Sequence, residues 1–127
     1  MNQLAGLTLA YLGDVTYESA VRERLIGRGL TKVNDLHRAA IRYTSAVGQA
    51  KVAKVLCGSF LSEDEIAVFK RGSNASSGRK PKNTDFETYR HATGLEALIG
   101  FLRIEKAEIR LEEVLQECFQ IIEEDED

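Results

Sequence analysis

The sequence predicts an all-α protein with a single domain over residues 1–122, followed by an acidic tail over residues 123–127. Apolar residues recur three and four positions apart through most of the chain, which is the spacing of helices that bury one face. Two Ser/Thr-x-x-Glu sequences, at 62–65 and 84–87, are capping boxes that mark helix starts. The chain has 127 residues, enough for one domain that buries about two thirds of its unfolded surface.

The first predicted helix runs from Gln3 to Arg28 and is apolar on nearly all sides, which is typical of a central helix. Gly29 is able to adopt a positive φ angle and ends this helix. A second helical segment starts at residue 35 with Asn34 as its N-cap. It continues to about residue 57, with a break near residues 44–45.

The two capping boxes begin the next two helices. Ser62 starts a short helix that ends near Arg71, and Thr84 starts a long helix that ends near Glu105. Between them, residues 72–83 are rich in turn-forming residues and predict a loop. A last helix presents six apolar residues to the core: Ile109, Leu111, Val114, Leu115, Phe119 and Ile122.

Asp14 is an acid in an otherwise apolar and aromatic stretch that includes Leu12 and Tyr17. A buried ionised carboxylate must be paired, protonated or bound to a cation. Glu96 is the single acid in a second apolar stretch, residues 92–102, and no basic residue lies three or four positions from it. Two carboxylates without local partners indicate a shared site. The alternative for the first stretch is a turn between two short strands over residues 8–16.

Two carboxylates in a helical core suit a hard cation that prefers oxygen ligands, such as Mg²⁺. This ion commonly keeps several waters and takes one or two protein carboxylates, so Asp14 and Glu96 form a sufficient direct set. A bound Mg²⁺ can activate water and relieve negative charge in phosphodiester hydrolysis. This chemistry requires the two helices to pack side by side.

Basic residues are concentrated in one stretch of a chain whose net charge is −3. Residues 70–84 contain five basic side chains and no acid: Lys70, Arg71, Arg79, Lys80 and Lys82. Because acids outnumber bases in the chain, this concentration predicts an external anionic partner, with phosphates as the obvious candidate. A solvated linker is the alternative.

Two features bear on the cellular compartment. Cys57 and Cys118 show no zinc-binding spacing, so neither a zinc site nor a disulfide framework is expected. The N-terminus has no basic segment followed by an apolar core, and no apolar run approaches membrane-spanning length. We therefore expect a cytoplasmic protein with no membrane partner.

The stretch Leu9–Asp14, which reads LAYLGD, resembles the signature helix of ribonuclease III catalytic domains, and Thr93–Leu102, which reads TGLEALIGFL, resembles their second acidic motif. An ordered set of shorter motifs is similar to the mini-ribonuclease III family, whose members lack the double-stranded-RNA-binding domain. These motifs are Asn34–His37, Ser45–Ala46 with Gln49–Ala50, Lys70–Gly72 with Asn74–Ala75, Pro81–Asp85, and Tyr89–Arg90 before Ala92–Thr93. Ser73 departs from the family, which usually has a basic residue there.

The resemblance implies a helical nuclease domain that dimerises through Leu9–Glu18 and hydrolyses phosphodiester bonds in double-stranded RNA. Asp14 and Glu96 match the two acids that hold the catalytic Mg²⁺ in the family. The implied RNA-binding residues are Lys70, Arg71, Asn74, Arg79, Lys80 and Lys82. The implied substrate is the 23S ribosomal RNA precursor, in the bacterial cytoplasm or, for a processed form, in a plastid.

Ribonuclease III proper has further acids at positions that match Leu7, Ala10 and Thr93, and this chain has none of them. The resemblance therefore implies a sparser metal shell that water completes, with the Thr93 hydroxyl orienting a water molecule. The missing acids leave open a catalytically inactive RNA-binding ribosome-assembly protein with the same fold. A helical protein-interaction module, in which the two acids make only buried hydrogen bonds, is a further alternative.

Overall fold

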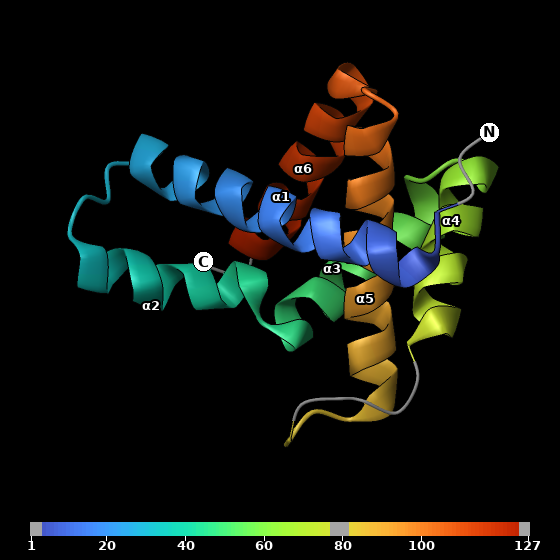
Figure 1. The fold of residues 1–127 in the computed structure, drawn as a ribbon. Helices are drawn as coiled ribbons and strands as arrows, with labels where there is room; N and C mark the ends of the chain where they lie inside the picture. Colours follow the sequence, from blue (N-terminus) through green and yellow to red (C-terminus); the bar gives the residue numbers. More distant parts are fainter. Residues whose placement is uncertain (1–3, 77–81, 125–127) are drawn as a thin grey trace.

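The computed structural model describes residues 4–76 and 82–124, which form six helices and no strands (Figure 1). The helices are α1 (Gly6–Gly27), α2 (Val33–Thr44), α3 (Ala46–Ser59), α4 (Glu63–Ala75), α5 (Phe86–Ile104) and α6 (Glu108–Glu123). The predicted all-α fold is confirmed. The alternative of two short strands over residues 8–16 is wrong, because α1 is continuous there. No helix in the two described ranges is long and apolar enough to cross a lipid bilayer.

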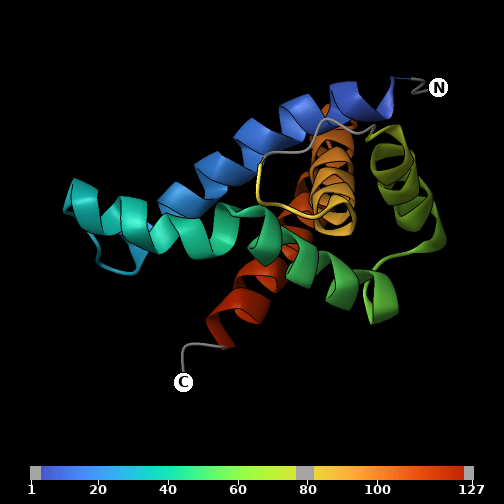
Figure 2. The same ribbon diagram turned by 90° about the horizontal axis from the view of Figure 1, so that it is seen from below.

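Helix α5 is the centre of the fold. Its side chains at Leu95, Leu98 and Ile99 are fully buried. Helix α1 crosses α5, α4 runs beside it, and α3 and α6 also pack against it (Figures 1 and 2). The C-terminal half of α1 and the antiparallel α2 extend to one side as a helical hairpin (Figure 1). Glu96 therefore lies on the most enclosed helix of the molecule.

Helix α1 is not the central helix that its apolar sequence predicts. One face is buried, with Tyr17 and Val21 almost inaccessible to solvent. The opposite face leaves Leu7, Tyr11 and Val15 exposed over 48%, 83% and 57% of their surfaces. The helix is apolar on two sides because one side packs on α5 and the other is an uncovered surface of this chain.

Capping signals in the sequence placed three boundaries as predicted. Ser62 caps α4 in a full capping box: its hydroxyl accepts the Glu65 N–H at 3.2 Å, and its own N–H donates to the Glu65 carboxylate at 2.9 Å. Ser45 separates α2 from α3 and caps α3 with its hydroxyl. Gly29 follows α1 with a φ of 103°. These signals are reliable because each acts within one turn of the chain.

Two predicted N-caps are wrong. Helix α2 begins at Val33, so Asn34 lies inside its first turn and does not cap it. Helix α5 begins at Phe86, where the Asp85 carboxylate, and not the Thr84 hydroxyl, accepts the Thr88 N–H at 2.8 Å. A carboxylate forms a charge-assisted bond with a helix N-terminus and outcompetes the neighbouring hydroxyl.

Helix α4 continues to Ala75, beyond the predicted end near Arg71. The prediction treated Gly72 as a turn residue, but this glycine lets two helices pack closely. A Cβ atom at Gly72 would lie only 2.4 Å from the Cβ of Ala97 on α5. Burial against α5 offsets the low helix propensity of glycine, so the helix passes through it. Part of the predicted loop, residues 77–81, lies outside the described residues.

The first turn of α6 is tied to the first turn of α4 by Arg110. Its guanidinium donates to both carboxylate oxygens of Glu65, at 2.7 and 2.8 Å, and to the Phe60 carbonyl oxygen at 2.9 Å. The hydrogen bonds from Arg110 hold the pKa of Glu65 below its usual value. Ile109, which we predicted to face the core, is 80% exposed beside this ion pair.

The end of α6 is held by the hairpin of α1 and α2. Glu123, which the sequence assigns to the acidic tail, is the last residue of α6. Its carboxylate accepts hydrogen bonds from Arg24 Nε at 2.8 Å and from the Tyr43 hydroxyl at 2.8 Å, and Arg28 lies 3.3 Å away. Glu123 thus belongs to the folded domain, while residues 125–127 of the tail lie outside the described residues.

Candidate active site

Helices α1 and α5 cross with their backbones in direct contact. A Cβ atom at Gly13 would lie 1.7 Å from the carbonyl oxygen of Glu96, and one at Gly100 would lie 1.9 Å from the carbonyl oxygen of Leu9. No other residue type fits at either position without moving a helix, because both obstacles are backbone atoms. This paired close approach places Asp14, the residue after Gly13, beside Glu96.

The two carboxylates differ in environment. Asp14 is exposed, so the prediction that it is buried in an apolar run is wrong. Glu96 is partly buried, and its pKa is raised to about 8, first by burial and then by the neighbouring Asp14 carboxylate. The Gln49 side chain on α3 donates from Nε2 to Glu96 Oε2 at 3.3 Å and opposes this rise. A partly buried acid whose ionisation is disfavoured by a neighbouring carboxylate forms a site that a cation would stabilise.

The donor set fits Mg²⁺. The groups that set the pKa of Glu96 are Asp14 and Gln49, and neither is a cation. Residues 4–76 and 82–124 contain no cluster of three or more His, Cys, Asp or Glu side chains that could hold a metal ion. Two carboxylates with water completing the shell is an arrangement in which proteins commonly hold Mg²⁺, so Asp14 and Glu96 could hold such an ion.

Thr93 lies one turn before Glu96 on α5 and is 5% exposed. Its hydroxyl donates to the Tyr89 carbonyl oxygen of the same helix at 3.0 Å. Since the hydroxyl proton is used within the helix, Thr93 could orient a water molecule only by accepting a hydrogen bond from it.

Two of the basic candidates lie on a helix and not on a loop. Lys70 and Arg71 are exposed residues of α4. Arg71 also donates a hydrogen bond to the Leu4 carbonyl oxygen, just before α1. Both residues therefore lie within α4, whereas the sequence placed them where the predicted helix meets the loop over residues 72–83.

The other candidates lie at the end of α4 and before α5. Asn74 is exposed on α4, and its side-chain oxygen accepts a hydrogen bond from Arg90 Nη2 at 2.9 Å. Lys82 is exposed, whereas Arg79 and Lys80 lie outside the described residues. Arg90 had no role in the sequence interpretation beyond its place in a family motif. Its contact with Asn74 shows that the start of α5 helps to position the end of α4.

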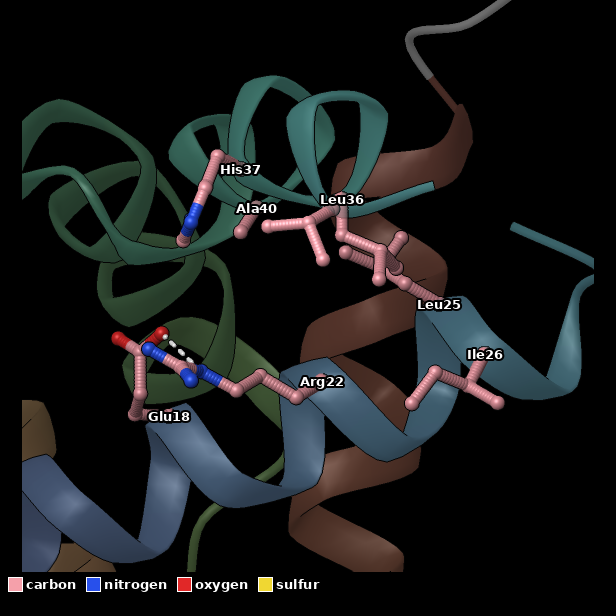
Figure 3. Close-up of a pocket in the computed structure, with 8 residues that line it drawn as sticks. Glu18, Arg22, Leu25, Ile26, Leu36, His37 and Ala40 are labelled. Atoms are coloured by element: carbon pink, nitrogen blue, oxygen red, sulfur yellow. Dashed lines mark hydrogen bonds and ion pairs between the residues drawn. The ribbon is translucent and has the colours of Figure 1, made fainter. Parts of the chain in front are cut away.

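A separate pocket of about 190 Å³ lies between α1 and α2 (Figure 3). Leu25 and Leu36 contribute to its apolar wall, and His37 extends from α2 toward the ion pair of Glu18 and Arg22 on α1 (Figure 3). This ion pair joins residues one turn apart on α1 and has an N–O distance of 3.0 Å. Neither acid of the α1–α5 crossing lines this pocket.

The fold and the site define a helical domain that presents a carboxylate pair where two helices cross. Residues 7–107 match the family model described as the ribonuclease III domain. The chain belongs to this family, which confirms the resemblance that the sequence motifs indicated.

Individual relatives share most of their length with this chain. The Mini-ribonuclease 3 of Brevibacillus brevis is 51% identical over 117 residues, which cover 92% of this chain and 87% of the relative. The Mini-ribonuclease 3 of Enterococcus faecalis is 46% identical, and the match covers 93% of this chain and 90% of the relative. A Fusobacterium nucleatum protein solved by X-ray crystallography matches with a TM-score of 0.83 at 25% identity, over 94% of both chains.

Proposed function

We propose that this protein is an endoribonuclease that hydrolyses phosphodiester bonds in double-stranded RNA with Mg²⁺ held by Asp14 and Glu96. The observation that carries the proposal is the glycine-paired crossing of α1 and α5, which brings two carboxylates together. Membership of the ribonuclease III domain family supports the reaction class. The relatives named Mini-ribonuclease 3 support the narrower assignment.

Asp14 and Glu96 have different positions in the proposed site. Asp14 and Glu96 would hold the ion, with Asp14 exposed to RNA and water and Glu96 partly buried. Bound Mg²⁺ would supply an activated water and neutralise charge on the phosphoryl oxygens. The close backbone contact at Gly13 and Gly100 would hold the two carboxylates near each other.

We infer that RNA is bound through its phosphates and its duplex shape. An A-form duplex offers phosphates and 2′-hydroxyl groups across a shallow minor groove, so charge and shape dominate over base reading. Lys70, Arg71 and Asn74 on α4, with Arg79, Lys80 and Lys82 after it, are the proposed contacts. The 23S ribosomal RNA precursor as substrate, and a cytoplasmic location, are proposed from the family resemblance.

A long double-stranded RNA, incubated with wild type and Asp14→Asn, tests the proposed reaction. We expect wild type to cleave it with Mg²⁺ and not with EDTA, and Asp14→Asn to be slower by at least about 1,000-fold, because losing the ion removes several kcal/mol of charge stabilisation. Binding of the RNA by gel shift, without cleavage of either this RNA or precursor ribosomal RNA, would favour the inactive ribosome-assembly protein instead.

We also propose that two copies associate through the exposed face of α1. Leu7, Tyr11 and Val15 lie four residues apart on this face, so they form one apolar stripe. Beyond Val15 the same face of α1 carries the ion pair of Glu18 and Arg22 and then Ile26, and these three residues line the pocket of Figure 3. A two-fold axis across α1 would cover the stripe of each copy with that of the other.

Tyr11→Asp should convert the dimer to a monomer in sedimentation velocity at micromolar concentration, because a charge would have to be buried at the centre of the contact. Ile109→Asp is the matched control, since Ile109 is 80% exposed at the start of α6 and is remote in sequence from the stripe. Equal sedimentation of the Tyr11 and Ile109 variants would show that α1 is not the contact.

A further inference from the structure

We propose that Gln49 is a positioning residue that holds the Glu96 carboxylate in the orientation required for cation binding. This inference rests on the proposed function, because it assigns a role in the same site. Gln49 is neither acidic nor basic, and the sequence singled it out only as part of a family motif. The observation that carries the inference is its hydrogen bond, from Nε2 to Glu96 Oε2 at 3.3 Å.

The local structure fixes the position of Gln49 before it meets Glu96. Ser45 caps α3 by accepting the Gly48 N–H at 3.1 Å. A Cβ atom at Gly48 would lie 2.2 Å from the Arg42 carbonyl oxygen, so the start of α3 packs tightly on the end of α2. Gln49, the next residue, is 3% exposed. Its amide therefore extends from a backbone that has little freedom to move.

An amide suits this position better than the other side chains that could reach it. A buried amide is stable only when it is hydrogen-bonded, so the bond to Glu96 restrains both side chains. A lysine or arginine would also bind the carboxylate, but its charge would compete with the metal ion. The amide holds one carboxylate oxygen and adds no charge, which leaves the negative charge of Glu96 available to a cation.

The hydrogen bond from Gln49 acts on the carboxylate and not on the ion, as groups that orient metal ligands commonly do.

Binding of Mn²⁺, measured by the loss of its free electron paramagnetic resonance signal, tests the inference without any cleavage assay. We expect Gln49→Met, which keeps length and volume but cannot donate, to weaken Mn²⁺ binding by about 10-fold or more. The Mg²⁺ concentration for half-maximal cleavage should rise similarly. Gln49→Leu repeats the test if Gln49→Met fails to fold, as judged by circular dichroism.

Tyr43→Phe is the control for general loss of stability. The Tyr43 hydroxyl donates to Glu123 at 2.8 Å and accepts from Arg28 at 3.2 Å, away from the two acids. We expect this variant to lose stability and to keep wild-type Mn²⁺ affinity. Wild-type affinity in Gln49→Met would overturn the positioning role alone. Absence of Mn²⁺ binding by wild type would instead overturn the proposed function and, with it, this inference.

Discussion

Glu96→Gln should abolish RNA cleavage and, in EDTA, make the protein more stable than wild type. Cleavage is lost because a neutral amide is a poor ligand for Mg²⁺. Stability rises because the wild-type side chain is partly buried beside Asp14, where its charged form is disfavoured and its pKa is raised to about 8. Side chains whose charged form is unfavourable in the folded protein are commonly found at functional sites.

The stability gain should depend on pH with a definite sign. The unfolded chain releases the Glu96 proton near 4.5, and the folded chain releases it near pH 8. Between these values the folded state holds more protons, so the free energy of unfolding of wild type falls as pH rises. Glu96→Gln has no titratable group at this position, so its free energy of unfolding does not fall for this reason. At pH 8 we expect it to be more stable by an amount on the order of 4 kcal/mol, since the pKa is displaced by more than three units and each unit corresponds to about 1.4 kcal/mol.

Thermal unfolding of both proteins in EDTA, at pH 5 and pH 8, measures this difference. The melting temperature of the variant minus that of wild type should be several degrees larger at pH 8 than at pH 5. A constant difference between the two melting temperatures would show that Glu96 does not carry a displaced pKa. Loss of stability in the variant at pH 8 would show that the Glu96 charge is compensated within the protein.

Gly100→Ala should destabilise the protein by at least about 3 kcal/mol and separate the two acids, because overpacking against a rigid backbone has no cheap relaxation. Its Cβ would lie 1.9 Å from the Leu9 carbonyl oxygen, far inside van der Waals contact. Helices α1 and α5 must therefore move apart, and Asp14 moves away from Glu96. Mn²⁺ affinity and cleavage should fall together, even in the fraction that remains folded.

Gly58→Ala is the matched control, since Gly58 also lies in a helix and a Cβ there would meet nothing within 4 Å. It should leave cleavage unchanged and raise stability by roughly 0.5–1 kcal/mol, the difference in helix propensity between the two residues. Urea unfolding of both variants provides the comparison. Equal stabilities would mean that the contact between α1 and α5 is looser than the structure shows.

Much of the helical architecture follows from local signals in the sequence. The Ser62 capping box, the Ser45 break and the positive φ of Gly29 all depend on residues within one turn of each other. Such interactions have the same geometry in any fold, so they can be predicted from sequence patterns. The prediction failed at Asp85 and Thr84, two adjacent acceptors that compete for one helix start.

Contacts between helices decided what local signals left open. Gly72 reads as a turn in the sequence but continues α4, because its missing side chain makes room for Ala97 of α5. Ile109 fits the apolar pattern of α6 but is exposed, because the first turn of that helix is held by the Arg110 ion pair. Each outcome depends on a partner that is distant in sequence.

The sequence by itself determined the all-α class and identified two acids, Asp14 and Glu96, that lacked local partners. Only the tertiary structure decided that they meet, that Asp14 is exposed while Glu96 is partly buried, and that Gln49 binds Glu96. The physical reason is that capping signals and apolar periodicity lie among near neighbours along the chain, whereas burial and the pKa of a carboxylate depend on which helices cross and how closely. That closeness is set by two glycines whose only sequence signal is the absence of a side chain.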